Sequence, residues 1–327
     1  PEDVLVHAEV YVRIYFAGMI PSLIYNVGAG LLRAVGDSRR PLYFLISACM
    51  VNIVLDVLLV VGLEMGVAGA AIATIFSQAV SAVLVVLTLL RSRQAYRLEP
   101  RKIRFYGNLL DRIVRIGFPA GLQSVMYSLS NIIIQASINA FGTDIVAAYT
   151  AYGKLDGLYW MMINAFGVSI TTFVGQNFGA GKYDRMRRSV RVCLLMTFGA
   201  TVLMSGFFLL LGEPLYRLFT DDAQVIALGM QILRLLVPTY VTYICIEVLA
   251  GAVRGTGDSL IPTLFTLTGV CLLRVAWVMG VAPAYHSLTV VLLSYPITWT
   301  ITSVLFVIYY LKGGWLKRSI SKAKLEA

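Results

Sequence analysis

The chain has 327 residues, of which 58% are hydrophobic and only 13% are charged, and its mean hydropathy is +0.79. Soluble domains carry about 25% charged residues, so this composition excludes soluble enzymes and nucleic-acid-binding proteins. A membrane-spanning helix needs about 20 mostly apolar residues, and the chain has room for many. We therefore expect an all-α polytopic membrane protein.

Nine apolar segments are predicted to span the membrane. Several exceed one bilayer thickness, which implies tilt or a kink, and Pro21, Pro119 and Pro238 each interrupt one segment and remove a backbone donor. The predicted spans are residues 4–33, 41–61, 67–90, 112–141, 145–175, 189–212, 223–254, 260–283 and 286–311.

The only long polar connection, residues 91–111, is basic and helix-permissive, and it predicts a cytoplasmic linker between two bundles. The predicted organisation is therefore a partial N-terminal bundle of three spans (1–90), the linker (91–111), a C-terminal bundle of six spans (112–311) and a basic cytoplasmic tail (312–327).

Lysine and arginine residues gather in alternate loops and account for the net charge of +10. Acidic residues dominate the intervening loops. Because cytoplasmic loops of membrane proteins carry the excess of basic residues, we expect a multi-pass protein of the plasma (inner) membrane with a cytoplasmic C-terminus. The basic groups lie at 33–40, 91–115, 182–191, 254 and 312–324.

Two segments at the ends of long spans repeat one another. Residues 29–41 read AGLLRAVGDSRRP, and residues 250–262, which lie 221 positions later, read AGAVRGTGDSLIP. They indicate two parallel repeats of six helices each when complete, so we infer that the first three helices are missing here. Such symmetry is typical of secondary transporters, although the motif could be only a favoured turn sequence. The motif residues at the helix ends are Arg33, Gly36, Asp37, Pro41, Arg254, Gly257, Asp258 and Pro262.

Asp56 is the strongest candidate among the ionisable residues within the predicted spans, where charge is costly and often functional. Asn52 lies one turn earlier on the same helix face. Thr74, on the next span, is expected at similar depth, ~12–15 Å from the outer turn at about 1.5 Å per residue. Carboxylate, amide and hydroxyl oxygens suit a small cation, and a proton could bind instead. Alternatively, Asp56 caps or hydrogen-bonds a neighbouring helix.

Four further charged residues in the spans are candidates for a cavity or substrate site. Glu247 could face substrate or pair with an arginine such as Arg274. Lys154 and Asp156 are two residues apart and point to different helix faces, so they should not pair with each other. Each of them could line the cavity or hold neighbouring helices together.

The repeat motifs, with VGQNFGAGKYDR at 174–185 and GFPAGLQS at 117–124, resemble the multidrug and toxic compound extrusion (MATE) transporters over essentially the whole chain. The resemblance implies a Na⁺- or H⁺-coupled antiporter that exports amphipathic, often cationic compounds by alternating access of two bundles. It also implies a cation site at Asn52, Asp56 and Thr74, completed by an Asp on the absent first helix. Some members use a Glu eight residues after the proline of the seventh helix, where this chain has Tyr127.

The expected partners are small organic molecules and the lipid bilayer. We expect no cofactor besides the transported ion, no structural metal, no nucleic acid, a monomeric state and no enzymatic activity, since no nucleophile or His/Glu metal motif is found. Two alternatives remain. A lipid-linked precursor flippase of related fold should have a more cationic cavity, and a membrane channel or sensor should have a continuous polar pore.

Overall fold

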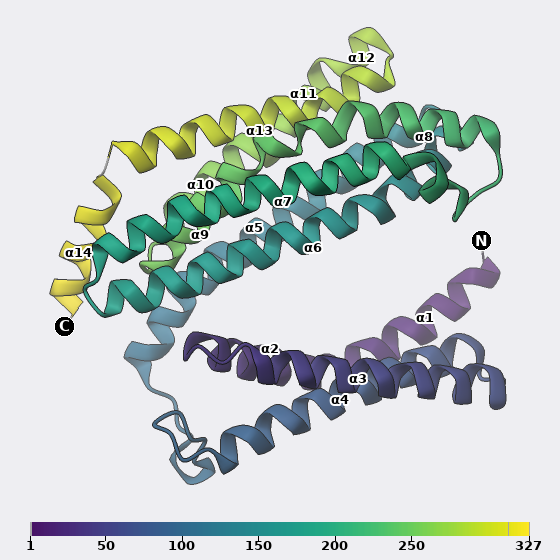
Figure 1. Ribbon diagram of the computed structural model, residues 1–327. Helices are drawn as coiled ribbons and strands as arrows, with labels where there is room; N and C mark the ends of the chain where they lie inside the picture. The colour runs from purple at the N-terminus through teal and green to yellow at the C-terminus, as the bar shows by residue number, and fades with distance from the viewer. Residues whose placement is uncertain (1, 313, 327) are drawn as a thin grey trace. The chain divides into compact units, whose positions relative to one another are not determined.

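The computed structural model describes residues 2–312 and 314–326, with side chains for 9–312 and 314–321. Within these ranges the regular secondary structure is entirely helical (Figure 1). The chain divides into two compact units, Pro1–Phe105 and Tyr106–Ala327. The expectation of an all-α fold is confirmed.

The first unit is organised around α4, which packs against α1, α2 and α3. Gly28 of α2 lies directly against Val85 of α4, so the missing side chain permits close approach of these helices. Tyr25, Leu32 and Val85 form the buried centre between α2 and α4. The elements are α1 (Glu2–Ala17), α2 (Met19–Ala34), α3 (Arg39–Asp56), the π-helix η1 (Val57–Gly62), α4 (Gly66–Arg91) and the 3-10 turn η2 (Pro100–Lys102).

The second unit is built on the long helix α6, which packs against α7, α8 and α9, while α9 also packs against α13. Figure 1 shows the long helices of this unit side by side. The elements are α5 (Gly107–Asn139), α6 (Thr143–Gly179), α7 (Tyr183–Arg217), α8 (Ala223–Leu236), η3 (Val237–Thr242), α9 (Ile244–Gly255), α10 (Leu260–Thr266), η4 (Leu267–Leu272), α11 (Leu273–Gly280), α12 (Ala282–Tyr285), α13 (Leu288–Leu311) and α14 (Gly314–Glu326).

Each of the nine apolar segments is helical, but the count of nine spans is not confirmed. Among the described residues, seven helical stretches are long and apolar enough to cross a membrane, and the bent pair α1–α2 would make an eighth. All but the last two residues of the segment 112–141 lie in α5, which is not one of these. Polar residues such as Gln123, Asn131 and Gln135 dilute the apolar character of α5.

The three prolines behave differently from one another. The 46° bend between α1 and α2 lies at Gly18, three residues before Pro21. Pro21 itself is in the first turn of α2, where the backbone N–H groups have no intrahelical acceptor, so the missing N–H of proline breaks no helical hydrogen bond. Pro119 lies inside the continuous helix α5, so the predicted interruption there is wrong. Pro238 interrupts its span as predicted, because the backbone changes there to the 3-10 segment η3.

The two copies of the repeated motif fold in the same way. Gly36 and Gly257 have φ angles of 91° and 89°, a region that favours glycine, and each donates its backbone N–H to the carbonyl three residues earlier at 2.9 Å. The next helices begin at Arg39 and Leu260, which are again 221 residues apart. The repeat is therefore a structural repeat at these helix ends.

The polar linker at 91–111 and the described part of the tail, 314–326, fold differently from one another. Between α4 and α5, only the short turn η2 is helical, so most of the helix-permissive linker is irregular. The tail forms α14, in which Trp315 and Leu316 are buried. The Trp315 indole donates to the carbonyl of Tyr310 at 3.1 Å, and Ser319 lies 3.0 Å from the Thr256 hydroxyl. These contacts attach the first turns of α14 to the second unit.

Candidate functional site

Asp56 is the last residue of α3, immediately before the chain changes to the π-helix η1. Such π-helical turns are frequently found at functional sites. Asn52 lies one turn earlier, and α3 packs along α4, which carries Thr74. Local helix geometry therefore places the Asp56 carboxylate and the Asn52 amide one turn apart on α3. The Thr74 hydroxyl lies on the neighbouring helix α4.

Asp56 and Asn52 each have a buried polar atom without a hydrogen-bond partner, namely Oδ1 of Asp56 and Nδ2 of Asn52. Within the described side chains, Asp56 forms no ion pair with a guanidinium or ammonium group. The Thr74 hydroxyl donates to the carbonyl of Ala70 at 2.9 Å, which leaves its lone pairs available as acceptors. Burying a polar group without a hydrogen-bond partner costs free energy. The unpartnered Oδ1 of Asp56 is therefore not explained by a structural role in this packing.

In the second unit, Asp156 lies within a group of aromatic donors. Its Oδ1 accepts hydrogen bonds from the hydroxyls of Tyr240 at 2.6 Å and Tyr152 at 3.1 Å. Its Oδ2 accepts a hydrogen bond from the indole of Trp160 at 2.7 Å. Tyr152 and Trp160 lie one turn before and after Asp156 on α6, whereas Tyr240 comes from η3. Asp156 thus joins α6 to the 3-10 break.

Arg274 is 2% exposed and lies against aromatic rings, with no carboxylate partner among the described residues. Its guanidinium carbon is 4.2 Å from the ring centre of Tyr295 and 5.8 Å from that of Trp299. One guanidinium nitrogen lies 3.4 Å from the Thr298 hydroxyl. This stacked geometry provides a cation–π environment for the charge.

Glu247 pairs with Arg254 rather than with Arg274, at 3.3 Å. The two residues are seven apart, which is two turns of α9, so the long arginine side chain reaches back along its own helix. The hydroxyl of Tyr243 lies 3.5 Å from the other oxygen of Glu247, and Tyr127 lies 3.2 Å from that hydroxyl. Glu247 therefore does pair with an arginine, but the partner is Arg254 and not Arg274.

Lys154 and Asp156 do not pair, as predicted, because Lys154 is exposed while Asp156 faces η3.

The motif residues lie at helix ends. Asp37 accepts from the backbone N–H of Arg40 at 3.1 Å, and the Pro41 carbonyl accepts from Tyr25 at 3.0 Å. In the second copy, Asp258 lies in the turn between α9 and α10, and Pro262 lies in the first turn of α10.

Sequence reasoning did not connect aromatic residues with these polar groups. The ring of Trp299, which is 1% exposed, lies within 5.5 to 6.3 Å of four other aromatic rings. The four-residue spacing of Tyr152, Asp156 and Trp160 was a readable signal, since such residues share a helix face. No sequence signal places the others beside them. The four neighbouring rings are those of Trp160, Tyr240, Tyr243 and Tyr295.

The sequence pattern of the MatE family matches residues 1–58 and 119–279. The probable multidrug resistance protein YoeA of Bacillus subtilis is 26% identical over 335 residues, covering 98% of this chain and 71% of YoeA. The probable multidrug resistance protein YpnP of the same organism is 29% identical over 274 residues, covering 84% of this chain and 61% of YpnP. The chain thus spans 61% to 71% of the length of these two relatives.

Solved structures of transporters share this fold. An outward-facing multidrug resistance MATE family transporter of the MOP superfamily matches with a TM-score of 0.86 at 23% identity, over 94% of this chain and 70% of that one. A MATE structure in the bent conformation matches with a TM-score of 0.84 at 22% identity, over 95% of this chain and 69% of that one. At these identities the likeness concerns the fold.

Proposed function

The chain belongs to the MatE family of multidrug efflux transporters, and from that membership we propose that it takes part in cation-coupled export of amphipathic or cationic organic compounds. The proposed mechanism is antiport by alternating access, with inward movement of Na⁺ or H⁺ driving outward movement of substrate. Coupling of this kind requires the ion to bind the inward- and outward-facing states with different affinity. An ionisable group that can exchange its ion is therefore needed within the spans.

The unpartnered carboxylate oxygen of Asp56 is the observation that supports this proposal. Asp156 and Glu247, by contrast, already receive hydrogen bonds or an ion pair from neighbouring side chains. A group without a fixed protein partner can bind and release an ion with little rearrangement of its neighbours. We assign Asp56 as the ion-binding group, with Asn52 and Thr74 as additional oxygen donors.

The proposed orientation follows from the basic loops. The turn between α6 and α7 and the first turns of α14 carry several cationic residues, and such loops face the cytoplasm in membrane proteins. We therefore place these ends, and the C-terminus, on the cytoplasmic side of the plasma membrane. The expectation of a monomer remains a prediction.

Replacing the Asp56 carboxylate by an amide tests this function. In proteoliposomes with imposed Na⁺ or H⁺ gradients, Asp56→Asn is expected to abolish gradient-driven transport of a fluorescent cationic dye while the inserted amount of protein stays unchanged. The matched control is Asp221→Asn, the same chemical change at an exposed turn, which should transport normally. Normal transport by correctly inserted Asp56→Asn would refute the coupling role.

A further inference from the structure

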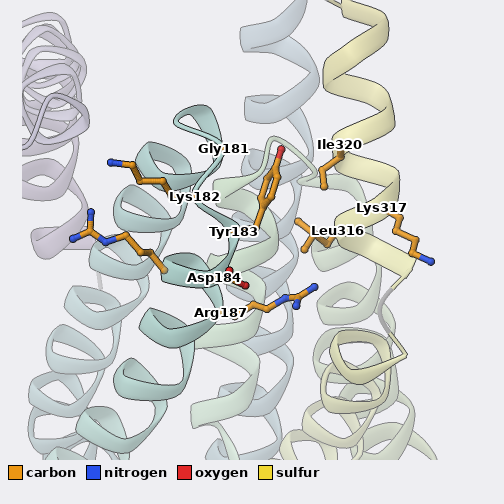
Figure 2. Close-up of a pocket in the computed structure, with 9 residues that line it drawn as sticks. Gly181, Lys182, Tyr183, Asp184, Arg187, Leu316, Lys317 and Ile320 are labelled. Carbon is orange, nitrogen blue, oxygen red and sulfur yellow. The ribbon is translucent and has the colours of Figure 1, made fainter.

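Two adjoining hollows lie in the second unit where α6 ends and α7 begins. The first, of about 680 Å³, lies between the α6–α7 turn and α14 (Figure 2). The second, of about 410 Å³, lies between α7, α9, α13 and the start of α14. Arg187 and Leu316 line both hollows, so the two hollows adjoin at these residues and together make up a depression on this end of the unit.

Several basic residues line the first hollow. Figure 2 shows Arg187 of α7 extending toward α14, which contributes Leu316 and Ile320 to the facing wall, whereas the side chains of Lys182 and Lys317 point away from the space between α7 and α14. Asp184 is the one acidic residue among the described residues that line it. The cationic residues on its lining are Lys182, Arg185, Arg187 and Lys317.

Arg187 and Arg191 are four residues apart on α7, so their side chains share one helix face, and both line the second hollow. Neither of the two guanidinium groups has an ion-pair partner among the described carboxylates. An arginine fork matches the geometry of a phosphate group and can bind it through two hydrogen bonds. This pair of cations is thus available to an anionic ligand.

Beyond the two arginines, the second hollow is mainly apolar. Its walls come from α7, α9 and α13, and α7 and α13 are both among the helices apolar enough to span a membrane. An acyl chain that follows α7 away from Arg191 would contact mostly aliphatic side chains. The aliphatic lining residues beyond the arginines include Val190, Leu194, Leu249, Val307 and Leu311.

The wall that closes this depression is held in place by the bundle. Trp315 is 3% exposed and stacks on Tyr310, with ring centres 5.2 Å apart. Its indole also donates to the Tyr310 carbonyl. The start of α14 is therefore packed against α13, and this packing fixes the wall of the depression that α14 provides.

We propose that this depression binds one anionic phospholipid of the surrounding membrane, with its phosphate held by Arg187 and Arg191 and an acyl chain along the apolar hollow. Basic pockets beside membrane helices are suited to anionic headgroups. A free phosphate would meet the same guanidinium groups but would leave the apolar part unfilled. The pair Arg187 and Arg191 and the aliphatic lining of the second hollow together favour the lipid.

Native mass spectrometry of the purified chain with added lipid tests this site. Dioleoyl phosphatidylglycerol is expected to bind at least about fivefold more tightly than dioleoyl phosphatidylcholine. Each basic residue near a membrane surface contributes about fivefold to binding of anionic lipid, so Arg187→Gln with Arg191→Gln should weaken phosphatidylglycerol binding about 25-fold. Leu194→Trp, which fills the apolar hollow, should weaken binding of both lipids while leaving the arginines in place.

Arg188→Gln is the matched control, because Arg188 follows Arg187 directly but lines a different hollow, with Phe166 and Met196. It should bind phosphatidylglycerol as the unchanged chain does, and unchanged melting temperatures would show that all variants are folded. Equal binding of the two lipids, or an equal loss in Arg188→Gln, would overturn the proposal. Displacement of the lipid by inorganic phosphate at equal concentration would also overturn it, in favour of a free-anion site.

Discussion

The hydroxyl of Tyr240 donates a 2.6 Å hydrogen bond to the carboxylate of Asp156. The two residues lie 84 positions apart, one in the 3-10 segment η3, which includes Pro238, and the other on the long helix α6. Pro238 has no backbone N–H, so a regular helical hydrogen bond is missing where α8 gives way to η3. The Tyr240–Asp156 hydrogen bond therefore holds the break in the α8–α9 span against the middle of α6.

Removing the Tyr240 hydroxyl should weaken this connection. We expect Tyr240→Phe to lower the free energy of unfolding by about 1–2 kcal/mol, because the Asp156 carboxyl loses one of its three hydrogen-bond donors. The ring stack of residue 240 on Tyr159, with centres 3.9 Å apart, should be kept. Thermal unfolding in detergent measures the change. Tyr285→Phe, at a residue that is 68% exposed, is the control and should melt as the unchanged chain does. Equal melting of all three proteins would contradict the prediction.

Gly167 lies directly beneath the Glu247 side chain, and an added Cβ would overlap the carboxyl group. Gly167→Ala should therefore displace Glu247, break its pair with Arg254 and lower the melting temperature of the second unit, at a cost of about 1–3 kcal/mol. Gly157→Ala is the matched control on the same helix, since a Cβ there meets no atom within 4 Å. If Gly167→Ala were as stable as Gly157→Ala, the close packing of Glu247 on α6 would be wrong.

The two motif glycines offer a paired test of the repeat. Alanine at Gly36 or Gly257, where φ is 91° or 89°, should destabilise the protein by about 1–2 kcal/mol in each case. The two losses should add in the double variant, because the glycines belong to different compact units and substitutions at independent sites are usually additive. Gly30→Ala is the control, as it lies inside α2 with open space around it. Chemical unfolding in detergent measures all four proteins, and a stabilised Gly36→Ala would contradict the prediction.

Arg274 should not tolerate replacement by lysine, although the charge is kept. The planar guanidinium stacks on Tyr295 and is buried, whereas an ammonium is more strongly hydrated and cannot stack in this way. We expect Arg274→Lys to destabilise the second unit by about 1–2 kcal/mol. Arg234→Lys, at an exposed position on α8, should leave the melting temperature unchanged. A loss of similar size in both variants would argue against the aromatic environment as the cause.

Part of the candidate site was predictable from local sequence. Asn52 and Asp56 share a helix face because their spacing matches one helical turn, and the repeated glycines required the same backbone turn in both copies. The pair of Glu247 with Arg254 was also a local possibility, because both residues lie on α9, two turns apart. Whether Arg274 of α11 reaches Glu247 depends instead on helix packing. The bend at Gly18 also depended on packing, since this glycine lies against Ile75 of α4.

The sequence by itself determined that the chain is an all-helical membrane protein with two related motifs, because apolar length, basic loops and repeated glycines are local properties. Only the tertiary structure decided which polar side chains meet inside the second unit. Asp156, Tyr240, Arg274 and Trp299 lie on different helical segments, and their distances follow from helix packing. The tertiary structure also showed that the basic tail begins as a helix packed against α13 through Trp315. The position of an amphipathic helix depends on the apolar surface against which it packs, and the sequence of the helix does not specify that surface.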